Sequence, residues 1–272
     1  MRPLQTALMA LCLFASPLVT AAAPNEISQT EWGEVFARQD ARGTLVVLDQ
    51  RTPSAQRQVY NPQRAAMRYS PASTFKVPHT LIALDRQIVS DEFTLFAWDG
   101  VDRGNPLWNR EQDLRSAMRN SVVWVFQDLA RRIGAPAERD ALARLDYGNH
   151  SVGQRIDDFW LDGSLRISAH EQVDFLERLY RNALPYPLAD QRLVKDLMLV
   201  DAGRDHILRA KTGWFSRHGE SIGWWVGWVE HPDGPVFFAL NIDMPAGIPD
   251  APKREAIVRQ ILHGIGALPA RP

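Results

Sequence analysis

Cysteine is almost absent from this chain. Among 272 residues the only one is Cys12, which lies in an apolar stretch at the N-terminus. We expect that stretch to be removed, so that the mature chain contains no thiol. A chain without thiols cannot form disulfides, use a cysteine nucleophile or build a cysteine-rich zinc site. Its stability must come from packing, for which the remaining ~250 residues are sufficient.

The apolar stretch predicts a secretory signal peptide. Arg2 supplies a positive charge, residues 4–20 are mostly apolar, and the small residues Ala21, Ala22 and Ala23 follow. The run is short for a bilayer span and has no basic stop-transfer flank, which disfavours a membrane anchor. We interpret residues 1–23 as a signal peptide cleaved at about 21–23, and we expect a periplasmic protein with no membrane attachment after cleavage.

The chain also has no excess of positive or negative charge. The chain has 31 basic and 32 acidic residues, a formal net charge of -1, and its basic pairs at 131–132 and 253–254 are too short to form a binding stripe. The seven histidines show no spacing that would place two metal ligands on one helix face. We therefore expect no nucleic-acid binding, no catalytic metal and no obligate protein partner.

Periodicity predicts strands near both ends of the chain and helices between them. The strands are expected at 44–49, 58–60, 207–211, 221–229 and 236–242. Helical apolar spacing covers 114–129 and 173–180, and a final helix is expected at 252–262, capped by Asp250. This order predicts an α+β fold with a mainly antiparallel sheet and flanking helices. We expect a single domain, 24–272, with an α/β lobe (about 24–72 and 195–272) and an inserted all-helical lobe (about 73–194).

Ser73 and Lys76 are the first candidates for chemistry. They lie three residues apart after Pro71-Ala72, a plausible helix start, so both side chains project from one face. A serine hydroxyl needs a base to become a nucleophile, and burial of a lysine supplies one by lowering its pKa. The same spacing also occurs by chance, as a helix cap followed by a solvated lysine.

Two further elements follow in a meaningful order. They are Ser121-Val122-Val123 and Lys211-Thr212-Gly213. Ser-x-x-Lys, a serine-containing triplet and Lys-Thr-Gly, in this order, are the signature of β-lactamases and penicillin-binding proteins. Ser121 is suited to relay a proton, and the Lys211 strand edge offers a cation and backbone groups to an extended substrate, which Gly213 allows to approach closely.

Within that superfamily the sequence resembles the class D, oxacillinase-type serine β-lactamases over essentially the whole mature chain. The segments that carry the resemblance are Ser73-Thr74-Phe75-Lys76, Ser121-Val122-Val123, Tyr147-Gly148-Asn149, Asp158-Phe159-Trp160-Leu161, Lys211-Thr212-Gly213-Trp214 and 223–228. Class A enzymes have Ser-Asp-Asn as the second element, whereas this triplet ends in Val123.

The resemblance implies that Lys76 reacts with CO2 to become an N-carboxylated, anionic base. No other cofactor is implied beyond this CO2 or bicarbonate. The matching apolar residues are Phe75, Val123, Trp160 and Leu161, and the Trp160 indole N–H is expected to donate to the carbamate. The alternative is that Trp160 is a core aromatic and Val123 a packing residue, and both descriptions are compatible.

The resemblance also implies roles for the remaining site residues. The backbone N–H groups of Ser73 and Trp214 form the oxyanion hole, and Ser121 with Lys211 protonates the leaving nitrogen. Arg254, with Thr212, is expected to bind the substrate carboxylate, unless it is a surface arginine paired with Glu255.

The expected function is hydrolysis of the β-lactam amide of penicillin-type antibiotics through a Ser73 acyl-enzyme, with a small-molecule β-lactam as the partner. Two alternatives stay open. One is a penicillin-binding transpeptidase or carboxypeptidase, which Val123 disfavours because such enzymes generally have Asn there. The other is a β-lactam sensor domain that binds the drug without turnover.

Overall fold

A seven-stranded sheet forms the centre of the computed structural model, which describes residues 26–269. Its order is β1-β3-β2-β9-β8-β7-β6, and all neighbours are antiparallel except β1 with β3. The strands are β1 (Glu26–Ser28), β2 (Gly43–Asp49), β3 (Gln56–Tyr60), β6 (Leu199–Ala202), β7 (Ile207–Arg217), β8 (Glu220–His231) and β9 (Gly234–Asp243), and a small second sheet pairs β4 (Leu95–Phe96) with β5 (Gln112–Asp113). The predicted α+β fold and its mainly antiparallel sheet are confirmed.

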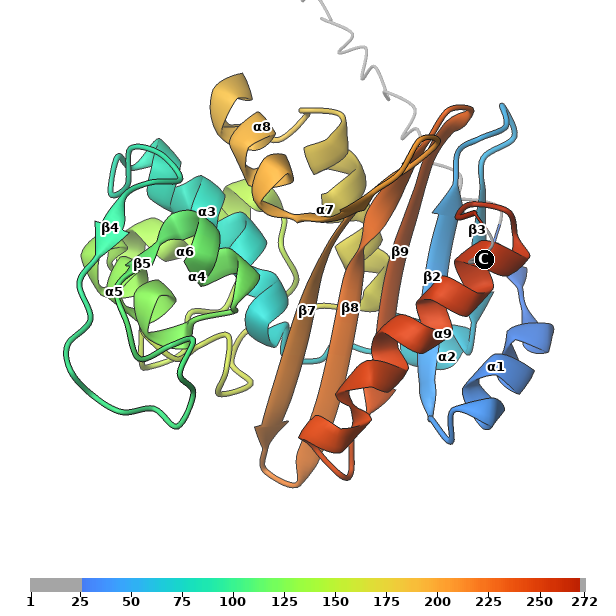
Figure 1. Cartoon of the computed structure of the whole chain (residues 1–272), viewed down its shortest axis with the longest axis horizontal. Coiled ribbons are helices and arrows are strands. Elements are labelled where there is room, and N and C mark those ends of the chain that lie inside the picture. The colour runs from blue at the N-terminus through green and yellow to red at the C-terminus, as the bar shows by residue number, and fades with distance from the viewer. Residues whose placement is uncertain (1–25, 270–272) are drawn as a thin grey trace, which may run out of the picture.

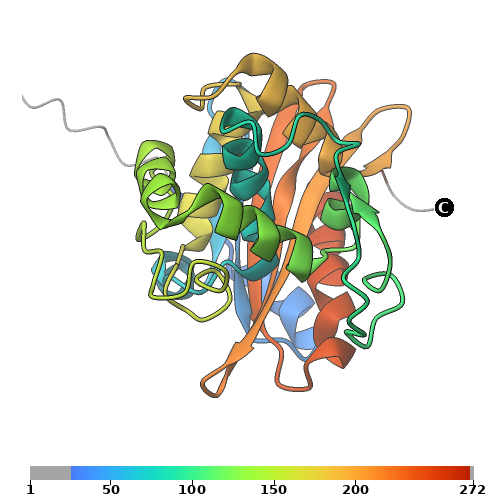
Figure 2. The ribbon, with the colours of Figure 1, turned by 90° about the vertical axis from the view of Figure 1, so that its left-hand side faces the viewer.

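Helices lie on both faces of this sheet, and most of them come between β3 and β6 in the sequence (Figure 1). They are α1 (Gly33–Arg38), α2 (Pro62–Ala66), α3 (Lys76–Asp85), α4 (Leu114–Arg119), α5 (Val123–Ile133), α6 (Ala135–Leu145), α7 (Ala169–Tyr180), α8 (Leu188–Leu197) and α9 (Ala251–Gly264), with short 3-10 helices η1 (Thr30–Trp32), η2 (Ala72–Phe75) and η3 (Ile248–Asp250). Seen from the side, the helices α3 to α6 stand in front of the sheet (Figure 2). None of the helices within 26–269 is long and apolar enough to span a membrane.

Strand β8 shows why the sheet has two cores. Its side chains alternate between the faces, as the period of a strand requires. Trp224 and Trp228 are buried in the core that β8 shares with α3, α5 and α7, whereas Trp225 is buried in the core against α1 and α9. The prediction that these tryptophans pack between sheet and helices is confirmed.

The helical periodicity across 114–129 is interrupted in the structure. Helix α4 ends at Arg119, and α5 begins at Val123. Between them Ser121 has a φ of 57°, in the left-handed region, which a continuous right-handed helix does not allow. The prediction of one helical stretch was therefore wrong at Ser121, and the break turns this residue out of the helix surface toward the sheet.

Two other details differ from the expectation. Strand β7 continues six residues beyond Lys211, to Arg217, because it pairs with β8 along its whole length. Asp250 was predicted to cap the final helix, but its side chain accepts from the Ala246 N–H at 2.8 Å and contacts Lys253 Nζ at 2.9 Å instead. The expected signal peptide, 1–23, lies outside the described residues.

Candidate active site

Ser73 and Lys76 meet where a 3-10 helix joins an α-helix. Ser73 lies in η2 and Lys76 is the first residue of α3. A 3-10 helix has three residues per turn, so side chains at i and i+3 lie one above the other. Lys76 Nζ is accordingly 2.8 Å from Ser73 Oγ, within hydrogen-bond distance. The structure thus brings the predicted nucleophile and its predicted base together.

Lys76 is fully buried, with an aromatic ring against its amine. The whole residue is 0% exposed, and its Nζ lies 5.1 Å from the centre of the Phe126 ring. Among the described residues, Ser73 is the hydrogen-bond partner of the amine. Burial lowers the pKa of Lys76 well below the ordinary lysine value, and the positive charge of Lys211 lowers it further. Both effects favour the neutral, nucleophilic form of the amine.

Trp160 contributes a polar group without a partner to the same region. Its ring stacks on Phe75 with 5.7 Å between centres, and the residue is fully buried. Its indole Nε1 makes no hydrogen bond with any described residue. An indole nitrogen is a donor only, and a buried donor without an acceptor is destabilising. This orphaned N–H fits an acceptor that the bare side chains do not supply.

Leu161 and Val123 border this region less closely. Leu161 is half-buried and packs against the core that contains Phe75 and Trp160. Val123 is also half-buried and opens α5, two residues after Ser121. Both positions suit side chains that limit the access of water.

Lys211 on β7 joins the Ser121 triplet to the Lys-Thr-Gly motif. Its Nζ donates to Ser121 Oγ at 3.0 Å and to the Thr212 carbonyl at 3.1 Å. Burial lowers the pKa of Lys211 to about 7, and the nearby charge of Arg254 adds to the effect. Ser121 reaches this lysine because of the left-handed backbone at its own position. A serine and a lysine that titrates near neutrality are together able to transfer a proton.

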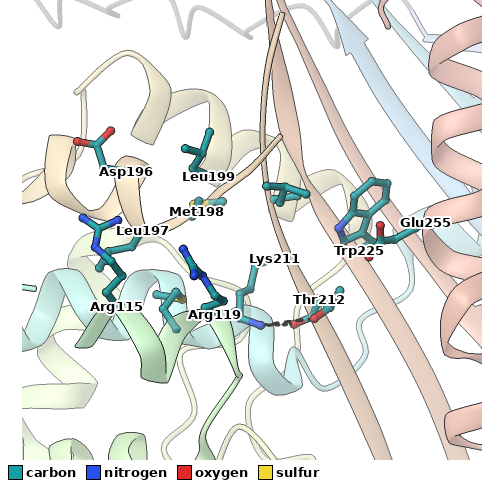
Figure 3. Close-up of a pocket in the computed structure, with 13 residues that line it drawn as sticks. Arg115, Arg119, Asp196, Leu197, Met198, Leu199, Lys211, Thr212, Trp225 and Glu255 are labelled. Carbon is teal, nitrogen blue, oxygen red and sulfur yellow. Dashed lines mark hydrogen bonds between the residues drawn. The ribbon is translucent and has the colours of Figure 1, made fainter. Parts of the chain in front are cut away.

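The outer edge of β7 is open beside this cluster. Strand β6 pairs only with Ile207 to Arg209, so from Lys211 onward β7 has no strand on its outer side within the described part of the chain. A pocket of about 420 Å³ lies along this edge, lined by Lys211 and Thr212 of β7 and by Arg115 and Arg119 of α4 (Figure 3). Trp214, 36% exposed, lies farther along β7. An extended substrate has access to backbone groups here.

Arg254 reaches the same strand from α9. Its Nη1 donates to the Gly213 carbonyl at 2.6 Å and its Nε donates to the Ala251 carbonyl at 2.9 Å. Burial lowers the pKa of this guanidinium. Its Nη2 makes no hydrogen bond with a described residue and is free to bind an anion. Glu255 lies 3.7 Å from Arg259 rather than in a pair with Arg254, so the alternative of a surface pair does not hold.

Two glycines explain how the strands fit together here. A Cβ at Gly223 would lie 2.8 Å from Arg254 Cδ, so this glycine of β8 leaves the path that the arginine takes over the sheet. A Cβ at Gly213 would lie 2.8 Å from the Pro71 carbonyl oxygen. Gly213 therefore allows the close approach of Pro71 and Thr74, and its expected role toward the substrate stays a prediction.

Tyr147 lies below the site and not in it. It is fully buried, its ring centre is 5.9 Å from that of Phe75, and its hydroxyl is 3.5 Å from Gln172 Oε1. Burial raises the pKa of Tyr147 above the ordinary tyrosine value. A tyrosine in this state supports the aromatic wall and is not suited to act as a base.

Sequence reasoning missed three residues near Lys76. Phe126 was not singled out, although it contacts the amine, and a buried pair of His79 and Glu138 lies against the same rings. Phe126 was recoverable in principle, since it lies on the apolar face of α5. Nothing in the spacing of His79 and Glu138, 59 positions apart, indicated that they meet.

Comparisons with known proteins agree with this geometry. The family model of the penicillin binding protein transpeptidase domain matches residues 43–263. β-Lactamase OXA-2 of Salmonella typhimurium is 55% identical over 246 residues, which cover 90% of this chain and 88% of that protein. The chain belongs to the class D β-lactamases. β-Lactamase OXA-48 of Klebsiella pneumoniae is 43% identical over 257 residues, 94% of this chain and 96% of that protein.

Solved class D structures superpose on the fold. The class D β-lactamase YbXI from Nostoc has a TM-score of 0.85 at 35% identity and covers 88% of this chain and 100% of its own. FUS-1 (OXA-85) from Fusobacterium nucleatum has a TM-score of 0.86 at 37% identity, covering 89% of this chain and 100% of its own. The family resemblance inferred from the motifs is thereby confirmed, and it places this class D chain within the wider penicillin-recognising superfamily.

Proposed function

We propose that this class D β-lactamase hydrolyses the β-lactam amide of penicillin-type antibiotics through an acyl-enzyme on Ser73. The observation that carries the proposal is the 2.8 Å separation of Ser73 Oγ from a neutral, buried Lys76 amine. The relatives at 43% to 55% identity are β-lactamases by name, which supports the same reaction here. The substrate is a small molecule that enters along the open edge of β7.

Carboxylation of Lys76 supplies the base. The neutral amine and bicarbonate give a carbamate and water, with one N–C bond formed and the charge unchanged. Two features support this modification: the burial of Lys76, which favours the unprotonated amine, and the orphaned Trp160 N–H, which provides a donor for a carbamate oxygen. Carboxylated Lys76 is an anion within reach of the Ser73 hydroxyl, and its oxygens can accept the proton that this hydroxyl loses.

The site residues have different roles in the formation and the hydrolysis of the acyl-enzyme. Lys76 accepts the Ser73 proton, Ser73 attacks the lactam carbonyl, and the backbone N–H groups of Ser73 and Trp214 hold the oxyanion, each worth ~2.7 to 4 kcal/mol. Ser121 passes a proton from Lys211 to the leaving nitrogen over their 3.0 Å contact. Thr212 and the free Nη2 of Arg254 bind the substrate carboxylate. Lys76 then activates the water that hydrolyses the ester.

The N-terminal sequence supports a periplasmic location for this reaction. Residues 1–23 combine a basic start, an apolar run and small residues, the pattern of an exported protein. The periplasm is also where a β-lactam must be destroyed before it reaches the cell-wall enzymes. Fractionation of cells that express the full chain tests the location, since activity retained in the cytoplasm would contradict it.

Turnover of nitrocefin by the mature protein, with and without added bicarbonate, tests the function. We expect steady hydrolysis that increases with bicarbonate. A single burst without steady turnover would instead identify a transpeptidase-like enzyme or a β-lactam sensor. Intact mass after exposure to a penicillin tests the nucleophile, because Ser73→Ala should show no adduct, and an adduct on that variant would refute the assignment.

A further inference from the structure

A buried acid–base pair lies behind the Lys76 pocket and has no part in the steps above. His79 of α3 and Glu138 of α6 are both 0% exposed, and His79 Nε2 is 2.7 Å from Glu138 Oε1. The approach is off line for a hydrogen bond, and none of the polar side-chain atoms of the two residues has a hydrogen-bond partner among the described residues. At this separation an unprotonated imidazole nitrogen and a carboxylate oxygen would repel each other, so at least one of the two atoms carries a proton.

Burying such a pair destabilises the protein, and the packing of the fold alone does not explain why it is present. Ionisable groups in an apolar interior are destabilising unless they are paired, and buried ion pairs are often no better than apolar residues of the same size. Helices α3 and α6 have many buried apolar residues available for packing. The pair therefore calls for a role beyond joining two helices.

Its position points to Lys76. His79 follows Lys76 by three residues on α3, and its ring lies 5.0 Å from Phe75, 5.4 Å from Trp160 and 5.8 Å from Phe126, measured between centres. Of these three rings, that of Phe126 also lies against the Lys76 amine. Glu138 lies on the other side, toward Tyr186, whose pKa is raised to about 12 by burial and, to a lesser extent, by the charges of Asp85 and Glu138. The histidine thus faces the lysine pocket and the glutamate lies behind it.

The absence of other partners limits the charge states of the pair. A neutral histidine beside an ionised Glu138 would leave a net negative charge in an apolar core, which is strongly unfavourable. Two states are neutral overall, an imidazole with a protonated Glu138 and an imidazolium with a carboxylate, and only the second places a positive charge on the side of the lysine pocket. A positive charge in that position disfavours an ammonium on Lys76 and favours a carbamate anion. Both effects promote carboxylation of the lysine.

We propose that His79 and Glu138 form an imidazolium–carboxylate pair, and that this positioning pair favours carboxylation of Lys76. This inference rests on the carboxylation proposed above. Carboxylation converts a neutral amine and bicarbonate into an anionic carbamate and water, with the nitrogen lone pair forming the N–C bond. The pair donates nothing to this reaction. It sets the electrostatic environment in which the product anion is more stable than the reactant amine.

Glu138→Gln is the first test, because it removes the counter-charge that keeps His79 protonated. We expect the bicarbonate concentration for half-maximal nitrocefin turnover to rise about tenfold, the change produced by one pKa unit of electrostatic stabilisation. The turnover number at saturating bicarbonate should stay near that of the unchanged protein. The 13C NMR signal of the carbamate, in 13C-labelled bicarbonate, should weaken in parallel.

A second variant separates this role from a structural one. The double substitution His79→Phe with Glu138→Leu removes both charges and keeps the interior apolar, so the protein should fold with equal or higher thermal stability. Its bicarbonate requirement should still rise. Asp174→Asn is the matched control, since it breaks the ion pair with Arg57 between β3 and α7, where Asp174 Oδ1 is 2.6 Å from Arg57 Nη2, without touching the lysine pocket.

An unchanged bicarbonate requirement in the double variant would overturn the proposal, whatever happens to thermal stability. Failure of the proposed function gives a different result, because the unchanged protein would then show neither bicarbonate dependence nor a carbamate signal. If Glu138→Gln does not fold, the double variant decides the question alone.

Discussion

Lys76 and Lys211 are two buried lysines of one active site, and each lies within hydrogen-bond distance of a serine. Lys76 has an aromatic ring against its amine, and Ser73 is its hydrogen-bond partner. Lys211 has a hydroxyl and a carbonyl as acceptors, and it lines a pocket of about 420 Å³. Burial lowers the pKa of both, to about 7 for Lys211 and well below the ordinary lysine value for Lys76.

The difference between the two lysines shows how one residue type can be a proton donor in one place and a modified base in another. Burial lowers the pKa of both lysines, but Lys211 has two acceptors, the Ser121 hydroxyl and the Thr212 carbonyl, that can hold its ammonium form. Among the described residues Lys76 has only the Ser73 hydroxyl, so its amine is freer to react. A proton donor and a chemically modified base thus arise from the same side chain in a polar and an apolar environment.

The largest effect should follow from Lys76→Met, which keeps the volume and removes the amine. We expect nitrocefin turnover to fall by ~10²- to 10⁴-fold, the usual contribution of a general base. Added bicarbonate should restore nothing. Steady-state kinetics with a bicarbonate titration measures this, and turnover that is retained and still responds to bicarbonate would break the comparison by locating the base elsewhere.

Lys211→Met should cost less, because it removes a proton donor and a cation but leaves the base in place. A hydrogen bond to a charged group is worth ~1.5 to 3 kcal/mol, so kcat/KM should fall by ~10- to 100-fold. The acylation rate, from pre-steady-state kinetics, should carry the loss. Lys211→Arg, which keeps the charge, is the control. Full recovery with bicarbonate would show that Lys211 acts only through Lys76.

Trp160→Phe should weaken the carbamate without removing the amine. The variant keeps an aromatic ring and deletes the orphaned N–H, so the bicarbonate concentration for half-maximal activity should rise by ~10-fold or more. Trp228→Phe is the matched control, since its buried ring lies in the same core and its Nε1 donates to Glu230 at 3.2 Å. Equal effects of the two variants would mean that Trp160 contributes through packing and not through its N–H group.

The smallest effect concerns stability. In bicarbonate-free buffer Lys76→Met should raise the free energy of unfolding at neutral pH, because the unfolded chain protonates this lysine with a pKa of about 10.4 and the folded chain does not. Stability of the unchanged protein should rise with pH over that interval, so the gain of the variant should shrink toward pH ~10. Each kcal/mol corresponds to ~2 to 4 °C in Tm.

Thermal melts between neutral pH and pH ~10 measure the difference. Lys253→Met is a suitable control, since Lys253 is half-buried and contacts Asp250 Oδ1 at 2.9 Å. A gain that does not vary with pH would mean that packing, and not the charge of Lys76, is responsible.

The fold was predictable where the sequence has runs long enough to show a period. Strands β2, β8 and β9 have apolar stretches with clear turns between them. Strands β1 and β6 were not predicted, because both are short edge strands whose residues are exposed and show no alternation. The break at Ser121 accompanies its contact with Lys211, a residue 90 positions away, which no local pattern records.

The site was predictable to the extent that motifs mark it. Ser73, Lys76, Ser121 and Lys211 were found from their order, and the structure brings them together. His79 and Glu138 belong to no motif, and only the packing of α3 against its neighbours reveals them. The packing of Pro71 and Thr74 against Gly213 was not predicted, because these residues are about 140 positions away in the sequence.

Arg254 passes over Gly223 to reach β7, so residues far from the substrate can change the position of its guanidinium. The arginine starts on a helix whose buried residues, Ile257 and Val258, pack on the far core of the sheet. A substitution in that core shifts the helix, and the shift carries the guanidinium along the β7 edge. Selection by a new antibiotic therefore has targets that never touch the drug, and resistance surveys confined to cleft residues would overlook them.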